Sequence, residues 1–298
     1  MALYVDSFGF VPRRLDVDCA FGAVRTHAEH DAAQEWINAR ANRDGHVYPP
    51  IEYIRKPRSR ARFPRPTGSE RPSTLYRLPP SHEIRISTCV PDKETQRYGE
   101  AGFVAHFLGF LLGYRCQFED WWVDGKIATK PQVDFHIARE ASVGVCIDTA
   151  FSVWRRWSNR SRTVMINAAF LHNRAHAYQW DWERFLAEYQ VLDALYAVAE
   201  REFRIRDGSH KARIERLCKQ FGLYWDAEIV DRVVCLRNDL IHEALWGGQV
   251  PGTAPNNTFH LPIFLHRFNK RLGLAMLGFS NDYVCSGWAS LGQRVFDV

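Results

Sequence analysis

The chain has 298 residues, of which 46% are hydrophobic and 24% charged, and its formal net charge is +5 at pH 7. This length allows one large domain or two ordinary ones, and the composition excludes a disordered or fibrous chain. The mild positive charge permits an anionic partner such as nucleic acid without requiring one.

The seven cysteines are scattered, and no two of them have the C-x-x-C spacing. An odd number without disulfide or zinc spacing predicts reduced thiols and a cytoplasmic location. The N-terminus, MALYVDSFGFVPRR, lacks the basic lead and apolar run of a signal peptide. The most apolar run, residues 101–114, is too short to span a bilayer and contains His106, so we expect a buried helix and no membrane partner.

Residues 1–160 carry mixed signals and predict an α+β region. Residues 28–41 have helical spacing, and the alternating, β-branched segment 82–90 predicts a strand. Residues 54–78 are rich in Arg, Pro, Ser and Gly. Because prolines exclude a regular helix and a central strand, we predict a loop or linker there.

The rest of this region is easier to divide. The apolar helix is expected over residues 99–114. The Asp124-Gly125 pair, flanked by aromatic and apolar residues, predicts a hairpin turn. A further helix is expected to end near Trp157.

From about Thr163 the pattern is helical almost throughout, with apolar residues at three- and four-residue spacings. Ser209 is a candidate cap for the helix that follows it, and Asp226 for the next one, with Gly247-Gly248 as a C-terminal stop. The helices expected here cover 163–178, 180–203, 211–223, 226–246 and 260–279. The sequence therefore predicts a mainly α protein, with a helical bundle over residues 161–298.

One of these helices carries an unusual polar triplet in the segment CLRNDLIHEALWGG, residues 235–248. Asn238 and His242 are four residues apart and share a helix face, and the long side chain of Arg237 can reach that face. An imidazole beside a guanidinium and an amide can act on a phosphodiester. His242 would be the general acid or base, Arg237 would stabilise the phosphate charge, and Asn238 would orient either one.

A structural explanation is also open. An R-x4-H pair on a helix occurs often by chance. Arg237 would then bridge to an acid such as Asp239 or Glu243, and His242 would fill a polar pocket. In the catalytic interpretation the same two acids tune His242.

A long helix, a shorter helix with R-I-x-x-L, and a helix ending in R-N-x-L-I-H before a glycine together resemble the HEPN superfamily. ARIERLCKQFGLYWDAEIVDRVVCLRNDLIHEAL is most similar to its ApeA-like branch, which is associated with prokaryotic defence. The resemblance covers roughly residues 163–280. Many members are ribonucleases with an R-x4–6-H motif whose first spacer residue is polar, the position of Asn238 here.

The resemblance implies a homodimer through the helical bundle, in which two Arg-His pairs form one composite site. It also implies metal-independent RNA cleavage with no cofactor, leaving a 2′,3′-cyclic phosphate and a 5′-OH. The RNA would be tRNA or single-stranded RNA, and a partner protein of a defence system is a further expectation. One toxin branch has a tyrosine two residues after the histidine, which a partner enzyme modifies. Here that position is Ala244, so such neutralisation is not expected.

Other polar pairs are weaker. Arg204 and His210 also have R-x5-H spacing, but Asp-Gly-Ser between them forms a turn and fixes no helical geometry. His172 and His176 have the spacing of a metal-binding pair, yet no cysteine or carboxylate near them in the sequence completes a tetrahedral set, so no metal site is predicted. The acidic group Glu119, Asp120 and Asp124 is expected at a polar hairpin tip rather than around a cation.

The loop predicted over residues 54–78 is strongly basic, with aromatic residues interleaved. Such a segment is suited to RNA backbone contact with base stacking, or it is a solvated loop with no ligand. The residues expected to contact RNA are Arg55, Lys56, Arg58, Arg60, Arg62 and Arg65.

We therefore predict a HEPN-type endoribonuclease, with residues 1–160 in an RNA-binding or regulatory role. The alternative is a non-catalytic HEPN dimerisation or RNA-binding module of a larger defence complex. A small-molecule enzyme using residues 101–150 has no motif to support it.

Overall fold

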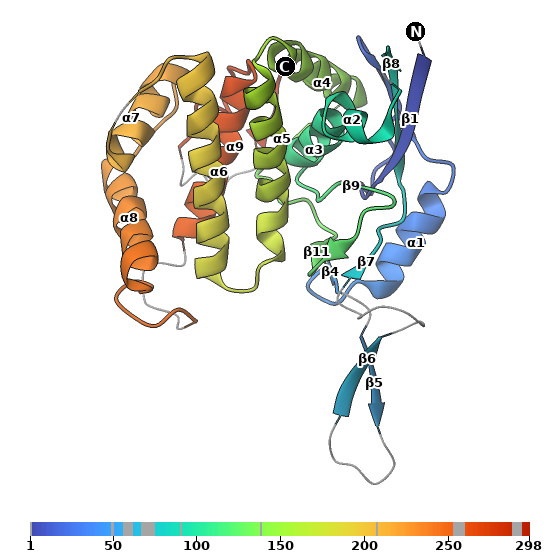
Figure 1. Ribbon diagram of the computed structural model, residues 1–298, viewed down its shortest axis with the longest axis horizontal. Helices are drawn as coiled ribbons and strands as arrows, with labels where there is room; N and C mark the ends of the chain where they lie inside the picture. The colour runs from blue at the N-terminus through green and yellow to red at the C-terminus, as the bar shows by residue number, and fades with distance from the viewer. Residues whose placement is uncertain are drawn as a thin grey trace.

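A computed structural model of the chain describes residues 2–48, 51–55, 62–66, 75–89, 91–137, 139–206, 208–252, 260–287 and 294–298. The protein is mainly α-helical, with a small antiparallel sheet on one side (Figure 1). Within the described residues, no helix combines the length and the apolar character needed to cross a bilayer.

The sheet is built from five strands in the order β2-β3-β8-β1-β9. Their bounds are β1 (Ala2–Gly9), β2 (Val17–Cys19), β3 (Gly22–Thr26), β8 (His82–Thr88) and β9 (Gln117–Phe118). In β8 every second residue is buried, as the alternating sequence predicts. The strand expected over 82–90 is thus confirmed, and Ile84 and Ile86 are fully buried in the core.

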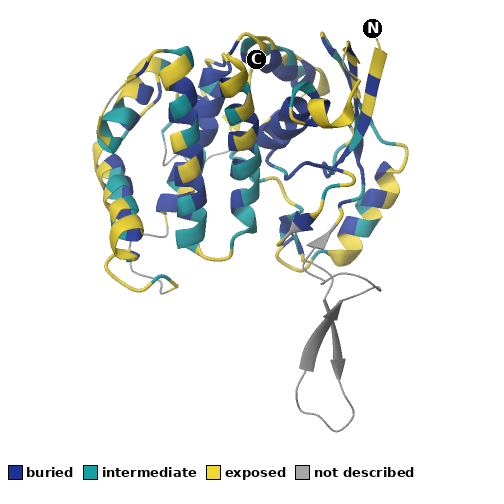
Figure 2. Ribbon diagram, in the orientation of Figure 1, coloured by how far each residue is buried: buried dark blue, intermediate teal, exposed yellow. Residues whose placement is uncertain are grey.

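Helix α3 (Glu100–Leu112) forms the centre of the molecule. All its residues after Glu100 are buried, and in Figure 2 the helix is dark blue throughout. It contacts β8 and β9 on one side and α4 and α5 on the other. The apolar run was therefore correctly interpreted as a buried helix. A single continuous hydrophobic core extends from the sheet into the helices beyond residue 160.

Five helices make up the C-terminal part: α5 (Asn159–Arg174), α6 (Asp181–Glu202), α7 (His210–Phe221), α8 (Ala227–Asn238) and α9 (Leu261–Met276). Helix α9 lies behind α5 and α6 in Figure 1 and contacts α6, α7 and α8. The predicted caps are both present. Ser209 accepts a hydrogen bond from the backbone N–H of Ala212 at 3.2 Å, and Asp226 accepts one from that of Ile229 at 3.1 Å.

The remaining elements are short or peripheral. Helix α1 lies close to the expected range 28–41, and α4 ends two residues before Trp157. Their bounds are α1 (His30–Arg40), α2 (Lys93–Arg97), α4 (Glu140–Arg155), η1 (Ala175–Ala177), η2 (Asp239–Glu243), β4 (His46–Val47), β5 (Ile51–Arg55), β6 (Arg62–Pro66), β7 (Leu75–Tyr76), β10 (Val123–Asp124), β11 (Ile127–Ala128), β12 (Phe135–His136) and β13 (Arg294–Val295).

Two expectations for the N-terminal region are wrong. The Asp124-Gly125 turn does not close a hairpin, because β10 pairs with β7 and β11 with β4. Gly125 does adopt the positive φ of a turn, 75°, but the two strands that flank it each pair with a strand far away in the sequence instead of with each other. The expected loop over 54–78 contains strand: β5 and β6 pair antiparallel from Ile51↔Pro66 to Arg55↔Arg62. Its prolines fit because a two-stranded ribbon has only edge strands.

Candidate functional site

The Arg-Asn-His segment closes α8 differently from the predicted helix over 226–246. The α-helix ends at Asn238, and Asp239–Glu243 continue as a π-helical turn. Ala244, in the left-handed conformation with φ 55°, ends that turn. Gly247 and Gly248 do not stop the helix. Both have positive φ, and they form a tight turn whose flanking residues Trp246 and Gln249 exchange backbone hydrogen bonds.

The π-helical turn brings Arg237 and His242 together. Around a regular α-helix, residues five apart point about 140° away from each other. The wider i→i+5 turn reduces this angle, and such turns are common at functional sites. Arg237 Nη1 lies 3.2 Å from His242 Nε2 and donates to Asn238 Oδ1 at 2.9 Å. The structure thus brings all three sequence-predicted residues into direct contact.

The direction of the Arg237–His242 contact follows from the chemistry of the two groups. A guanidinium can only donate hydrogen bonds, so in this contact His242 Nε2 is the acceptor. Asn238 and His242 are exposed. Arg237 is partly buried, with its guanidinium 5.9 Å from the Tyr189 ring and its Nε atom buried without a hydrogen-bond partner. A neutral imidazole at the surface, next to a fixed cation, can accept a proton from an approaching substrate.

A second histidine lies beside this group. His210, at the start of α7, contacts the Tyr189 hydroxyl through Nδ1 at 2.8 Å. Burial and the nearby charge of Arg237 lower the pKa of His210. In the sequence, the turn predicted between Arg204 and His210 sets this pair aside, and Arg204 has a positive φ of 58°. No local signal could have linked His210 to Arg237, because the two residues meet only where α7 and α8 pack together beside Tyr189 of α6.

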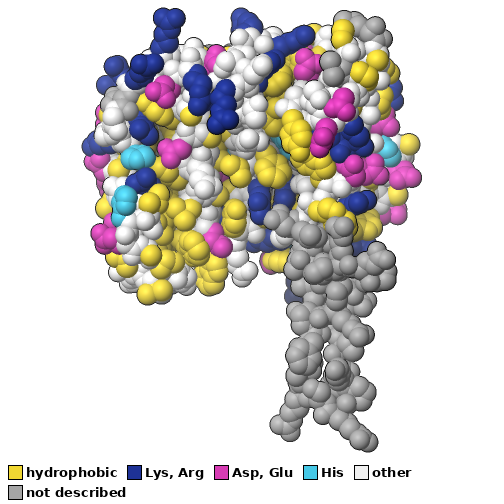
Figure 3. All heavy atoms as spheres, in the orientation of Figure 1, with side chains coloured by type: hydrophobic (Ala, Val, Ile, Leu, Met, Phe, Trp, Pro, Cys, Tyr) yellow, Lys and Arg dark blue, Asp and Glu magenta, His cyan; other side chains and the backbone are white. Residues whose placement is uncertain are grey.

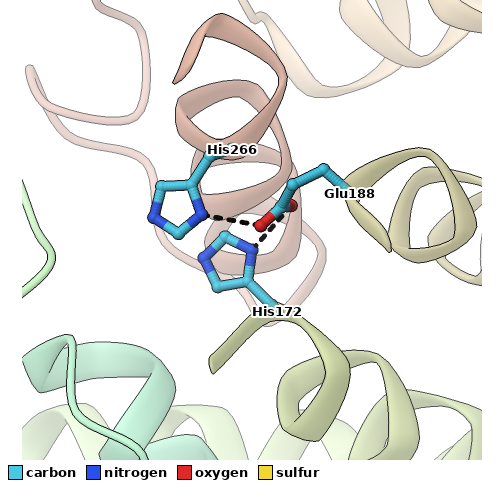
Figure 4. Close-up of side chains that lie close together, drawn as sticks. All are labelled: His172, Glu188 and His266. Carbon is cyan, nitrogen blue, oxygen red and sulfur yellow. Dashed lines mark hydrogen bonds and ion pairs between the residues drawn. The ribbon is translucent and has the colours of Figure 1, made fainter. Parts of the chain in front are cut away.

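A separate constellation lies inside the bundle, where His172, Glu188 and His266 converge from α5, α6 and α9 (Figure 4). His172 Nδ1 lies 3.0 Å from Glu188 Oε2, and His266 Nδ1 lies 2.7 Å from Oε1. A carboxylate therefore does lie beside His172, although none is near it in the sequence. Glu188 is 16 residues away in the chain, and helix packing brings it into contact.

The hydrogen bonds indicate where the protons of this constellation lie, and His266 Nε2 also lies 3.4 Å from the backbone oxygen of Gln132. Arg184 donates to His176 Nδ1 at 3.2 Å, so the His176 Nε2–H faces His266 Nε2, also at 3.2 Å. His266 and His172 then each donate from Nδ1 to Glu188. Burial lowers the pKa of His172 to about 3 despite the carboxylate beside it. Burial alone would raise the pKa of Glu188, but attraction to and hydrogen bonds from the two rings hold it well below its usual range.

The geometry of the three side chains does not suit a single metal ion. Their ligand atoms all lie within 4.8 Å of one another. The His172 and His266 rings are stacked, however, with centroids 4.0 Å apart and an interplanar angle of 3°. A metal ion lies near the plane of each imidazole that binds it, and one ion cannot lie in two separate parallel planes. In this arrangement the two imidazole rings form hydrogen bonds with Glu188. To bind a metal ion with all three side chains, at least one ring would have to rotate out of the stack.

The structure describes only some of the residues in the predicted basic segment, and it shows the contacts of one residue in the predicted acidic group. Arg55, Arg62 and Arg65 lie in the β5–β6 ribbon, whereas Lys56, Arg58 and Arg60 lie outside the described residues. In the acidic group, Asp120 binds Arg97 Nη1 at 2.6 Å and Lys93 at 3.5 Å. The carboxylate of Asp120 is therefore balanced by side-chain cations.

The described part of the chain thus presents an exposed cluster around Arg237 and His242 and a buried one around Glu188. Two cavities, of about 250 and 500 Å³, are lined by other residues than the exposed triplet. The triplet lies on the exposed surface and outside these two cavities. No protein-family model, curated protein or solved structure matches the chain.

Proposed function

We propose that the protein is a metal-independent endoribonuclease of the HEPN type, with Arg237, Asn238 and His242 as its catalytic residues. The observation that supports this best is the 3.2 Å contact of Arg237 with the exposed His242. The two groups differ in chemistry and share one open surface. That combination suits a charged polymer, because its backbone can reach both side chains at once.

The proposed reaction assigns one role to each residue. His242 Nε2 removes the proton of a ribose 2′-OH, whose oxygen forms a bond to the adjacent phosphorus. The bond from phosphorus to the 5′-oxygen breaks, and that oxygen leaves with a proton from an imidazolium. The products are a 2′,3′-cyclic phosphate and a 5′-OH. Arg237 turns from His242 to the phosphate and stabilises its negative charge, and Asn238 orients the guanidinium through their 2.9 Å hydrogen bond.

Base and acid act on opposite sides of the phosphorus, so two histidines serve the reaction best. A homodimer in which two α8 helices face each other would supply a second His242. Ile241, next to His242, is 50% exposed, and Val250 is 70% exposed. Hydrophobic side chains also gather over the lower ends of α6 and α8 in Figure 3. An apolar surface around the triplet favours contact with a second copy.

The test is cleavage of tRNA and of a labelled single-stranded RNA in EDTA, by wild type, by His242→Ala and by His136→Ala. His136 is an exposed histidine on β12 and serves as the matched control. We expect wild type and the control to cut, and His242→Ala to lose about 10²–10⁴-fold in rate. Cleavage that survives in His242→Ala would refute the assigned site.

The second candidate is a non-catalytic module for dimerisation or RNA binding in a defence complex with a partner protein. The exposed apolar residues beside His242 favour it, because they suit an interface as well as a site. Binding of RNA by wild type and by His242→Ala, without cleavage by either, would support this function over the nuclease.

RNA binding by the basic segment around β5 and β6 remains a sequence-based prediction. Replacement of Arg55, Arg58 and Arg60 by glutamine is expected to weaken RNA binding. It should also reduce the slope of log affinity against log salt by about one for each phosphate group that the variant no longer binds. An unchanged slope would remove this segment from the RNA-binding surface.

A further inference from the structure

A cavity of about 250 Å³ lies between α6, α9 and the segment 131–134. Three cationic side chains line it: Arg184 from α6, and Arg267 and Lys270 from α9. His176 and His266 line it as well, and the one acid in its wall is Asp134. Its polar lining is thus mostly cationic.

Asp134 balances these three charges only in part, because Arg271 and Tyr283 also bind its oxygens. It accepts hydrogen bonds from Arg271 at 3.1 Å and from the Tyr283 hydroxyl at 2.7 Å, and Arg267 Nε lies 3.5 Å away. Arg271, which is 1% exposed, takes up much of the single negative charge. Arg267 Nη1 is buried with no hydrogen-bond partner.

Lys270 is the least balanced cation of the cavity. It is 2% exposed, and its ammonium lies 4.0 Å from the centre of the Phe110 ring. Within the described residues, no hydrogen-bond acceptor or carboxylate contacts this ammonium. Burial lowers the pKa of Lys270 to about 7, although Asp134 and Glu188 act in the other direction. An anion that enters the cavity would supply the partner that the Lys270 ammonium lacks and would stabilise its charged form.

The positions of these three cationic side chains indicate what kind of anion the cavity would bind. Two guanidinium groups and an ammonium approach from two helices, and a tetrahedral phosphoryl group can accept hydrogen bonds from all of them. We propose that this cavity binds the phosphoryl group of a small molecule, either free phosphate or a phosphate monoester, through Lys270, Arg184 and Arg267. The hydrogen-bonded chain from His176 through His266 to the Glu188 carboxylate stiffens the floor of the site. The proposal is independent of the ribonuclease activity.

A metal ion bound to the neighbouring His172, Glu188 and His266 is the alternative ligand, and the positive charges that line the cavity would repel it. A divalent cation at His172, Glu188 and His266 would lie close to the cationic lining of this cavity. It would also displace the protons that the two rings donate to Glu188. The anion needs neither change.

The test uses thermal unfolding with inorganic phosphate, with AMP as a monoester and with Zn²⁺ as separate additives. Phosphate or AMP should raise the Tm of wild type by at least about 3 °C, increasing with the logarithm of ligand concentration. A larger effect of AMP assigns the site to a monoester, and an equal effect assigns it to phosphate itself. Both outcomes support the shared chemistry.

Lys270→Met is the decisive variant. Methionine fills the same space without charge, so the Tm without ligand should equal or exceed that of wild type, whereas affinity for phosphate should fall at least about tenfold. Arg184→Gln, with a side chain 30% exposed, decides if Lys270→Met does not fold. Arg216→Gln, on the exposed surface of α7, is the matched control and should keep the ligand response.

Three results would overturn the proposal. One is no rise of Tm for wild type with phosphate or AMP up to about 10 mM. Another is a full response retained in the Lys270→Met and Arg184→Gln variants. The third is stabilisation by Zn²⁺ alone that is lost in His266→Gln, which would assign the cluster to a metal.

Discussion

Two polar clusters begin at neighbouring residues of α6 and face different environments. Glu188 points into the bundle, where it is 1% exposed and binds His172 and His266. Tyr189 contacts His210 and lies beneath the Arg237 guanidinium, at the foot of the exposed triplet. One turn of helix thus supports both a sealed hydrogen-bond network and an open one.

The two clusters contain similar residue types, but one is buried and the other exposed, and this difference decides what each can contribute. In the sealed cluster each proton has a fixed place, and the loss of one partner leaves buried donors without acceptors. In the open cluster water replaces any missing partner, so substitutions there should cost little stability and affect chemistry instead. Stability and activity should therefore separate cleanly between the two clusters.

The largest effect is expected from Glu188→Ala. It leaves the Nδ1–H donors of buried His172 and partly buried His266 without their acceptor, and should lower the free energy of unfolding by about 3–5 kcal/mol. Urea denaturation measures this directly. Glu200→Ala, an exposed glutamate on the same helix, is the control and should match wild type. A loss below about 1 kcal/mol in Glu188→Ala would mean that the network is not structural.

Next in size is Arg237→Gln, which tests the open cluster under the proposed nuclease function. Loss of the guanidinium should lower kcat/KM for RNA cleavage about 10²–10³-fold, as for removal of one group that stabilises transition-state charge. The urea midpoint should stay close to that of wild type. Arg216→Gln should leave cleavage unchanged. Destabilisation without a specific loss of activity would place Arg237 among the structural residues.

The pH dependence of stability should come from the sealed cluster. The pKa of His172 is lowered to about 3 in the folded state, whereas a free histidine titrates near 6.5. Below about pH 6.5 the unfolded chain binds the proton first, so stability is full above that pH and falls as the pH drops toward 3. The expected slope from this residue is about 1 kcal/mol per pH unit between pH 6 and 4. In His172→Gln the slope of unfolding free energy against pH should decrease by that amount; an identical slope would show that His172 is not buried neutral.

The smallest effect is expected from Tyr189→Phe, at the boundary of the two clusters. It removes the hydroxyl that contacts His210 and keeps the ring under Arg237. We expect a stability loss of about 1 kcal/mol and less than a tenfold change in RNA cleavage. A loss of cleavage as large as that of Arg237→Gln would give the Tyr189–His210 pair a direct part in the chemistry.

Much of the fold followed from short-range signals in the chain. The caps at Ser209 and Asp226, the apolar run that became α3 and the alternation in β8 act within a few residues, so local patterns were enough to find them. The Asp124-Gly125 hairpin failed because distant strands competed successfully for both flanks of the turn. The candidate triplet was visible in the sequence because Arg237 and His242 lie within one segment.

By itself, the sequence determined that the protein is mainly helical, where most helices begin and end, and which polar residues share the end of α8. Only the tertiary structure decided that α8 finishes in a π-helical turn with Arg237 against His242. It alone gathered His172, Glu188 and His266, which are separated by 16 and 78 residues. The physical reason is that caps and periodicity depend on neighbours in the chain. The contacts of these side chains depend instead on how whole helices pack to bury their apolar faces.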